Sequence, residues 1–231
     1  TMCGKKSTEV KEACCGDIVA VGKMDWKTGD TVCDPKNEVE LPAIDIPEPC
    51  YSMAISPKTK GQDDKVGYSR KDIDDIKKKM AELDMQVCSI CVPCYHKFLF
   101  EDDKNCVEYM KNVIDAAAEI GAENILIPFF GKSSLYQKDK KEFRQERLEP
   151  LVKRIKEIAR YAAKKDIVLA LENTITAEDN IKLLDMIGEP NVKVYFDTLN
   201  IVWTGDQPDV AIKKLGKNRI AQIHIKANAE F

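Results

Sequence analysis

This sequence predicts an α/β fold with about five parallel strands and covering helices, preceded by a small β-rich segment. From Gly67 onward, short apolar runs alternate with longer stretches in which apolar residues recur at helical spacing, a pattern typical of βαβ units. The first 67 residues are instead rich in Gly, Pro, Asp and Cys, with β-like runs at 17–21, 39–41 and 51–55. We therefore predict two parts, residues 1–67 and residues 68–231.

The elements of the second part follow in order along the chain. Ser69 is a candidate N-cap for a first helix that continues to about Leu83, and Gly121 is a candidate residue just past the end of the second helix. The elements predicted after the first helix are a strand at 85–92, a helix at 103–120, a strand at 124–130, a helix at 138–165, a strand ending on Glu172, a helix at 177–187, a strand ending on Asp197, a weaker helix at 208–215 and a strand containing His224.

The composition argues against several classes of protein. The net charge is −3 with both signs well mixed, which gives no electrostatic footprint for nucleic acid or anionic lipid. No run of about 18 apolar residues is present, and residues 1–10 lack the apolar core of a signal peptide. Nine cysteines without an export signal indicate reduced thiols. We therefore expect a cytoplasmic protein that binds neither nucleic acid nor membrane.

Glu172, Asp197 and His224 each lie at or near the carboxyl end of a predicted strand. Side chains alternate along a strand, so placing these three on one face of the sheet puts apolar residues such as Leu171 and Phe196 on the other face. An apolar outer face is what covering helices require. Parallel α/β barrels also build their sites at the carboxyl ends of their strands, so the pattern predicts a shared site.

The chemistry of such a site follows from its two carboxylates and one imidazole. Carboxylates that lie close together repel one another unless a proton or a cation lies between them. An added imidazole makes a mixed oxygen and nitrogen site that suits a divalent metal ion. The alternative is a structural salt-bridge cluster, in which Lys226 or Lys193 neutralises Glu172 and Asp197.

Four segments, AAEIGAENILIPF, LALENT, VYFDTLN with a following TGD, and KKLGKNRIAQIHIK, recur in a known family in this order and spacing. Through them residues 68–231 resemble the xylose-isomerase-like TIM barrels, a group of sugar phosphate isomerases and epimerases that also contains endonuclease IV. The resemblance covers the third to the seventh strand of such a barrel, so it implies an incomplete TIM barrel. An endonuclease IV-like phosphodiesterase is less favoured, because its three-metal site needs several more histidines.

The resemblance implies that Glu172, Asp197 and His224 bind one divalent ion, such as Mn²⁺, Mg²⁺, Co²⁺ or Zn²⁺. Glu172 would also remove the proton next to the substrate carbonyl, giving an enediolate that the cation stabilises. Asn200 matches a site-facing position of the family. The residues expected to contact a sugar or sugar phosphate are Asn200, Lys226 and His96. The alternative for His96 is an ordinary surface position in the loop.

The family's fourth metal ligand, a Glu on the eighth strand, has no counterpart here, and Glu230 is a poor substitute. We therefore expect weak metal binding and negligible isomerase activity from this chain. Residues 3–66, including VKEACCGDIVAVGKMDWKTGD, resemble elongation factor G from late domain II into domain III, so the chain reads as a hybrid. No G-x-x-x-x-G-K-[ST] loop is present. A non-catalytic fragment related to that translation factor is the competing functional class.

Overall fold

The computed structural model describes residues 2–3, 6–7, 9–14, 18–26, 29–34, 36–39, 41–42, 67–96, 98–138 and 141–226. The chain divides into two units, Thr1–Tyr51 and Ser52–Phe231.

The described residues of the first unit contain little regular structure. Strands β1 (Met2–Cys3) and β2 (Lys6–Ser7) form a short antiparallel pair, and Asp34 makes an isolated bridge to Asn37. The expectation of strands at 17–21 and 39–41 is wrong for the residues that are described there, which have no strand. Ile18 is 80% exposed, and an apolar run forms a strand only where it has a partner to pair with and a face to bury. The run at 51–55 lies outside the described residues.

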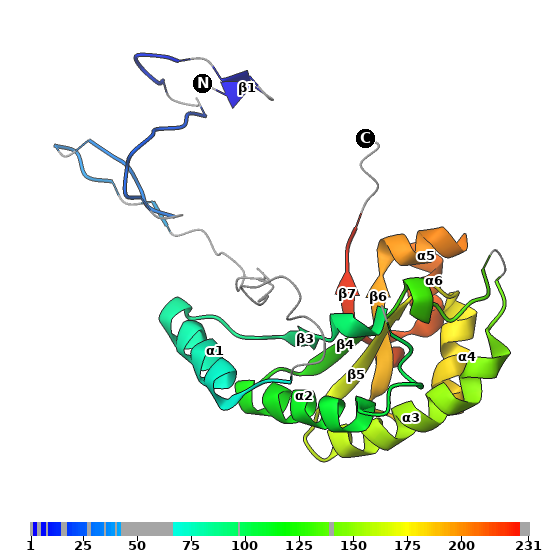
Figure 1. Ribbon diagram of the computed structural model, residues 1–231. Coiled ribbons are helices and arrows are strands. Elements are labelled where there is room, and N and C mark those ends of the chain that lie inside the picture. The colour runs from blue at the N-terminus through cyan, green and yellow to red at the C-terminus, as the bar shows by residue number, and fades with distance from the viewer. Residues whose placement is uncertain are drawn as a thin grey trace. The chain divides into compact units, whose positions relative to one another are not determined.

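The second unit is built on one sheet of five parallel strands. They are β3 (Ser89–Cys91), β4 (Asn124–Phe129), β5 (Val168–Asn173), β6 (Val192–Asp197) and β7 (Ile220–His224). Their spatial order is the same as their order along the chain. The sheet curls into a half-barrel (Figure 1), which confirms the prediction of an incomplete α/β TIM barrel.

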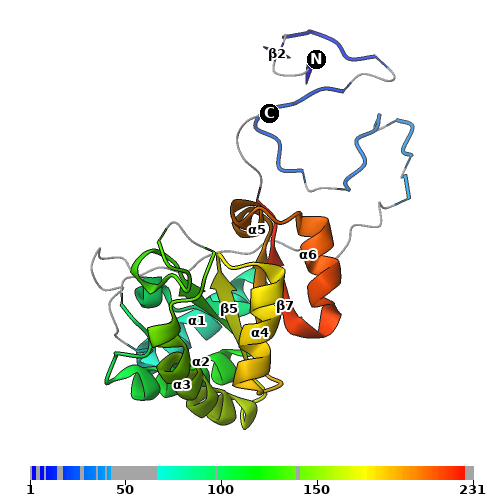
Figure 2. The same cartoon turned by 90° about the vertical axis from the view of Figure 1, so that its right-hand side faces the viewer.

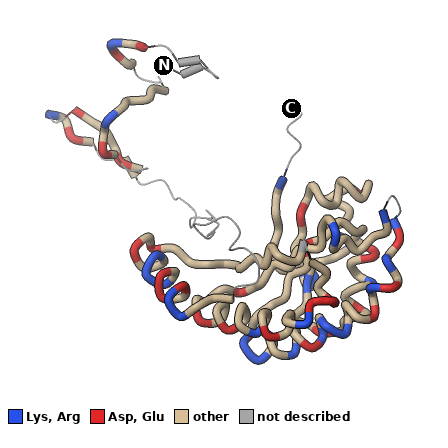
Figure 3. Tube along the Cα trace, viewed as in Figure 1, with Lys and Arg blue, Asp and Glu red and all other residues tan. Residues whose placement is uncertain are grey.

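Six α-helices accompany these strands in the described part of the unit, one before the first strand and five in the connections between strands. They are α1 (Arg70–Leu83), α2 (Cys106–Ile120), α3 (Gln145–Ala163), α4 (Ala177–Ile187), α5 (Thr198–Thr204) and α6 (Pro208–Leu215), with 3₁₀ turns η1 (Pro93–His96), η2 (Gly131–Ser133) and η3 (Lys217–Arg219). Helices α2, α3 and α4 follow the convex side of the sheet in Figure 1, and α4 lies beside α6 in Figure 2. Lysines, arginines and acidic residues alternate along these helices (Figure 3), as solvated outer faces require.

Local sequence signals explain where several helices begin and end. Ser69 caps α1 through a capping box, in which its side chain accepts from the backbone N–H of Asp72 and the Asp72 carboxylate accepts from the backbone N–H of Ser69. Gly121 ends α2 and Gly188 ends α4, both in the left-handed conformation that glycine adopts without strain. The observed bounds of α1, α4 and α6 therefore agree with the prediction.

Other boundaries differ from the prediction because tertiary contacts decide them. Helix α3 begins at Gln145 rather than near residue 138, since Tyr136 and Phe143 form an antiparallel bridge in the preceding segment. Strand β3 begins only at Ser89, which pairs with the first residue of β4. The short helix α5 was not expected; its N-cap is Asp197, the last residue of β6.

The two faces of the sheet bury different sets of side chains. Leu169 and Leu171 of β5 belong to the large core beneath the helices, whereas Ala170 packs with Leu126 and Tyr195 on the inner face. This alternation places Glu172 on the inner face. Among the described residues, no helix has the length and apolar character needed to cross a membrane.

Candidate metal centre

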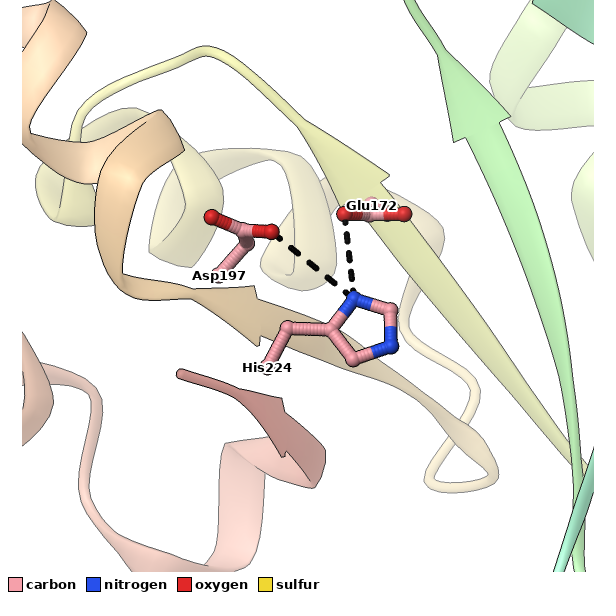
Figure 4. A group of neighbouring side chains, drawn as sticks. All are labelled: Glu172, Asp197 and His224. Carbon is pink, nitrogen blue, oxygen red and sulfur yellow. Dashed lines mark hydrogen bonds and ion pairs between the residues drawn. The ribbon is translucent and has the colours of Figure 1, made fainter. Parts of the chain in front are cut away.

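Glu172, Asp197 and His224 converge at the carboxyl ends of β5, β6 and β7 (Figure 4). Each offers one ligand atom, and the three atoms lie within 4.8 Å of one another. The His224 Nδ1 atom lies 3.4 Å from Glu172 Oε1 and 3.7 Å from Asp197 Oδ2. The Glu172 and Asp197 side chains are 7% and 0% exposed, while that of His224 is 38% exposed, so the centre opens to solvent on the imidazole side.

The orientation of Asp197 comes from its second role as the N-cap of α5. Its Oδ1 atom accepts hydrogen bonds from the backbone N–H groups of Leu199 at 2.9 Å and Asn200 at 3.0 Å. The helix therefore holds one carboxylate oxygen, and Oδ2 faces the centre. A strand that passes directly into a helix thus fixes this side chain.

Glu172 gathers its contacts on a single oxygen. Its Oε1 atom accepts a hydrogen bond of 3.3 Å from Asn200 Nδ2 and also faces the imidazole of His224. Asn200 is only 4% exposed, so its amide lies among protein groups rather than at the surface. Helix α5 therefore orients both carboxylates, Asp197 through its backbone and Glu172 through Asn200.

Lys226 supplies a cation to both carboxylates. Its Nζ atom lies 2.5 Å from Asp197 Oδ2 and 3.8 Å from Glu172 Oε1. The Thr198 hydroxyl accepts from the backbone N–H of Lys226 and donates to its carbonyl oxygen, both at 2.9 Å. Of the two lysines that the sequence offered as neutralising partners, the structure places Lys226 in this position.

The environment shifts the pKa values of the two carboxyl groups in opposite directions. Burial raises the pKa of Glu172, and the nearby His224 and Lys226 oppose the rise without cancelling it. Burial also acts to raise the pKa of Asp197, but the hydrogen bonds from Lys226 and from the Asn200 backbone outweigh it, so that the pKa of Asp197 is lowered. The same contact with Asp197 raises the pKa of Lys226. Two neighbouring carboxyl groups thus acquire unlike proton affinities.

The donor set fits a divalent cation in chemistry and nearly in spacing. Ligands about 2.1 Å from a common ion are roughly 3.0–3.5 Å apart in octahedral or tetrahedral geometry. The separations of 3.4 and 3.7 Å from His224 Nδ1 come close to this range. The three ligand atoms lie within 4.8 Å of one another, so a divalent ion would require the side chains to move closer together and the Lys226 ammonium to leave Asp197.

Two neighbours of the centre were not predicted as functional residues. The buried Tyr195 ring packs against the imidazole of His224 at a tilt, with 4.4 Å between ring centroids. Its inward direction follows from strand alternation with Asp197, so a signal was present. Thr198 gave no signal, because its role depends on a backbone segment 28 residues away.

Two residues considered from the sequence cannot be placed at the centre. His96 ends η1, and its side chain lies outside the described part of the structure, as does Glu230.

Comparison with known proteins agrees with this architecture. A family model described as the xylose isomerase-like TIM barrel matches residues 50–230. The match overlaps the end of the segment that resembles elongation factor G and leaves residues 3–49 uncovered, so that second resemblance stays a prediction from the sequence.

Solved structures with a similar fold include the following three proteins. A 3-keto-D-glucoside 4-epimerase from E. coli, in its apo form, has 17% identity and a TM-score of 0.58 over 68% of this chain and 65% of its own. A D-allulose 3-epimerase from Methylomonas sp., in complex with D-allulose, has 18% identity and a TM-score of 0.54 over 67% and 56%. The IOLI protein with a bound zinc atom has 14% identity and a TM-score of 0.53 over 69% and 58%. The chain thus spans less than two thirds of each.

Proposed function

Because the chain belongs to the xylose isomerase-like TIM barrel family, we propose that Glu172, Asp197 and His224 hold one divalent metal ion and serve the isomerisation or epimerisation of a sugar or sugar phosphate. The observation that carries the proposal is the convergence of two carboxylates and one imidazole at the carboxyl ends of three adjacent strands. The structural similarity to two sugar epimerases and to a zinc-containing relative supports it.

A bound Mn²⁺, Mg²⁺, Co²⁺ or Zn²⁺ ion would supply Lewis acidity, which polarises a substrate carbonyl group. We assign the proton transfer to Glu172. A general base works best when its pKa lies near the working pH, and burial moves the pKa of Glu172 upward in that direction. Its Oε1 atom is already engaged by Asn200 and His224, so Oε2 is the oxygen we assign to receive the proton from the carbon next to the carbonyl.

The neighbouring residues would position these groups. Asn200, which was expected to contact substrate, donates its amide to Glu172, and we therefore assign it the role of orienting the base. Tyr195 would hold the imidazole of His224 in place through the contact between the two rings. Asp197, with its lowered pKa, would remain ionised as a metal ligand across the physiological range.

The test separates metal binding from proton transfer. Binding of Mn²⁺ to the purified chain is measured by calorimetry. The Mn²⁺-loaded protein is then incubated in D₂O with ketopentoses, ketohexoses and their phosphates, and NMR follows the loss of the proton next to the carbonyl. We expect exchange with at least one of these compounds even where net isomerisation is negligible, because exchange requires only proton removal by one base.

Glu172→Gln should slow the exchange by at least about 100-fold, the lower range for loss of a general base. The matched control is Glu178→Gln, which removes an exposed carboxylate that pairs with Lys214 on the outer helices. The control should exchange like the wild type. Absence of Mn²⁺ binding by the wild type would overturn the metal centre, and an unchanged exchange rate in Glu172→Gln would overturn the assignment of the base.

A further inference from the structure

The Lys226 ammonium occupies the same side of the carboxylates as the imidazole. Glu172 Oε1 and Asp197 Oδ2 are the two oxygens that face His224 Nδ1, and they are also the two oxygens that lie nearest Lys226 Nζ. The ammonium therefore neutralises the atoms that a metal ion would need as ligands. With one positive charge against two carboxylates, it leaves the cluster with a residual negative charge.

We propose that Lys226 is a built-in competitor of the divalent ion, which holds the carboxylates in place without metal and must leave Asp197 before metal binds. The inference rests on the proposed metal centre and adds a residue that sets its affinity. A metal ion at ligand distance from Asp197 Oδ2 and an ammonium 2.5 Å from the same oxygen cannot share that position, because both are cations and both need its lone pairs.

The placement of Lys226 is a feature of the fold and does not depend on a chance surface contact. The Thr198 hydroxyl binds both the N–H and the carbonyl oxygen of Lys226, which ties this part of the chain to the start of α5. The Lys226 side chain is 50% exposed, so solvent is available to receive the displaced ammonium. The tether thus fixes the backbone while the four-carbon side chain stays free to swing outward.

The experiment measures affinity for Mn²⁺ alone, by calorimetry on the full chain. Lys226→Met removes the charge and keeps a side chain of similar length. We expect it to bind Mn²⁺ about tenfold more tightly than the wild type, which corresponds to the loss of one competing charged hydrogen bond. The control is Lys213→Met, which removes an ammonium whose partner is Asp209 on the exposed face of α6. Its affinity should equal that of the wild type.

A second readout needs no calorimetric signal. Without metal, Lys226→Met should melt at a lower temperature than the wild type, because two carboxylates then face each other without a cation. Addition of Mn²⁺ should raise its melting temperature by more than it raises that of the wild type, since a tighter ligand stabilises more at the same concentration. Should Lys226→Met fail to fold, Lys226→Gln replaces the charge with a polar group, and Thr198→Val loosens the tether while keeping the ammonium. Both should shift the affinity in the same direction.

The outcomes distinguish the two proposals. If the wild type binds Mn²⁺ and both Lys226→Met and Lys226→Gln bind it with the same or lower affinity, the competition by Lys226 is overturned. The metal centre itself then stands. Absence of Mn²⁺ binding in the wild type and in all Lys226 variants overturns the centre itself. Equal tightening in Lys213→Met would show a general effect of net charge, which also overturns the specific role of Lys226.

Discussion

Arg147 and Glu101 form an ion pair inside the protein that allows a quantitative test of the fold. Their side chains are 5% and 2% exposed, so water screens the pair very little. The guanidinium contacts both oxygens of the carboxylate, and Nη1 donates to the carbonyl oxygen of Ser134 at 2.8 Å. One side chain of α3 thus joins the segment after η1 to the segment after η2.

Arg147→Met should destabilise the protein by about 4 kcal/mol, because it leaves a buried carboxylate without its partner. The carbonyl of Ser134 loses its donor as well. For a unit of this size the loss corresponds to a decrease in Tm of roughly 8–16 °C. Urea unfolding followed by far-UV circular dichroism measures the change in the free energy of unfolding. Arg160→Met is the control on the same helix, since Arg160 is 69% exposed and its pair with Glu189 should contribute at most about 1 kcal/mol.

A double-mutant cycle with Glu101→Gln then isolates the interaction. The double variant should lose less free energy of unfolding than the two single variants together, by at least about 1 kcal/mol. The reason is that the double variant removes both charges and leaves no buried charge without a partner. A native-like Arg147→Met protein within about 1 kcal/mol of the wild type would refute the reasoning. Additive costs in the cycle would refute it as well.

Two further predictions concern helix ends. Burial acts to raise the pKa of Asp179, but hydrogen bonds with Lys182 and Tyr136 outweigh it and the pKa is lowered, so the ionised carboxylate stabilises the fold. Asp179→Asn should therefore lower the free energy of unfolding at pH 7 by about 1.5 kcal/mol. The difference should shrink as the pH falls below the ordinary pKa of 3.8 and through the lowered folded value, in urea titrations at several pH values. Gly121→Ala should cost about 1 kcal/mol, because φ is +79° there although a methyl group meets no atom within 4 Å. An unchanged urea midpoint would contradict this second prediction.

The sequence predicted those parts of the fold that local signals determine. Ser69, Gly121 and Gly188 mark helix ends through their own side chains or their own backbone freedom, and the ends they mark lie where expected. The start of α3 was misplaced because it depends on the bridge between Tyr136 and Phe143, which only the folded chain reveals.

The candidate site shows the same division. The grouping of Glu172, Asp197 and His224 followed from strand ends and alternation, because parallel strands bring their carboxyl ends to one edge. Their roles in metal binding and proton transfer stay predictions. The link between Thr198 and Lys226 could not be predicted from the sequence. It joins a side-chain hydroxyl to the backbone of a distant residue, and no sequence motif marks such a contact.

The matching order of strands in the chain and in the sheet has a consequence for folding kinetics. Each strand from β3 to β6 pairs with the strand that follows it in the sequence, after a connection that contains one or two α-helices. Contacts of this kind keep loop-closure entropy small, so the sheet is able to grow one strand at a time from any adjacent pair. Glu172, Asp197 and His224 lie on the last three strands of this series. We therefore expect the site to be complete only when all three of these strands have joined the sheet, whichever pair forms first.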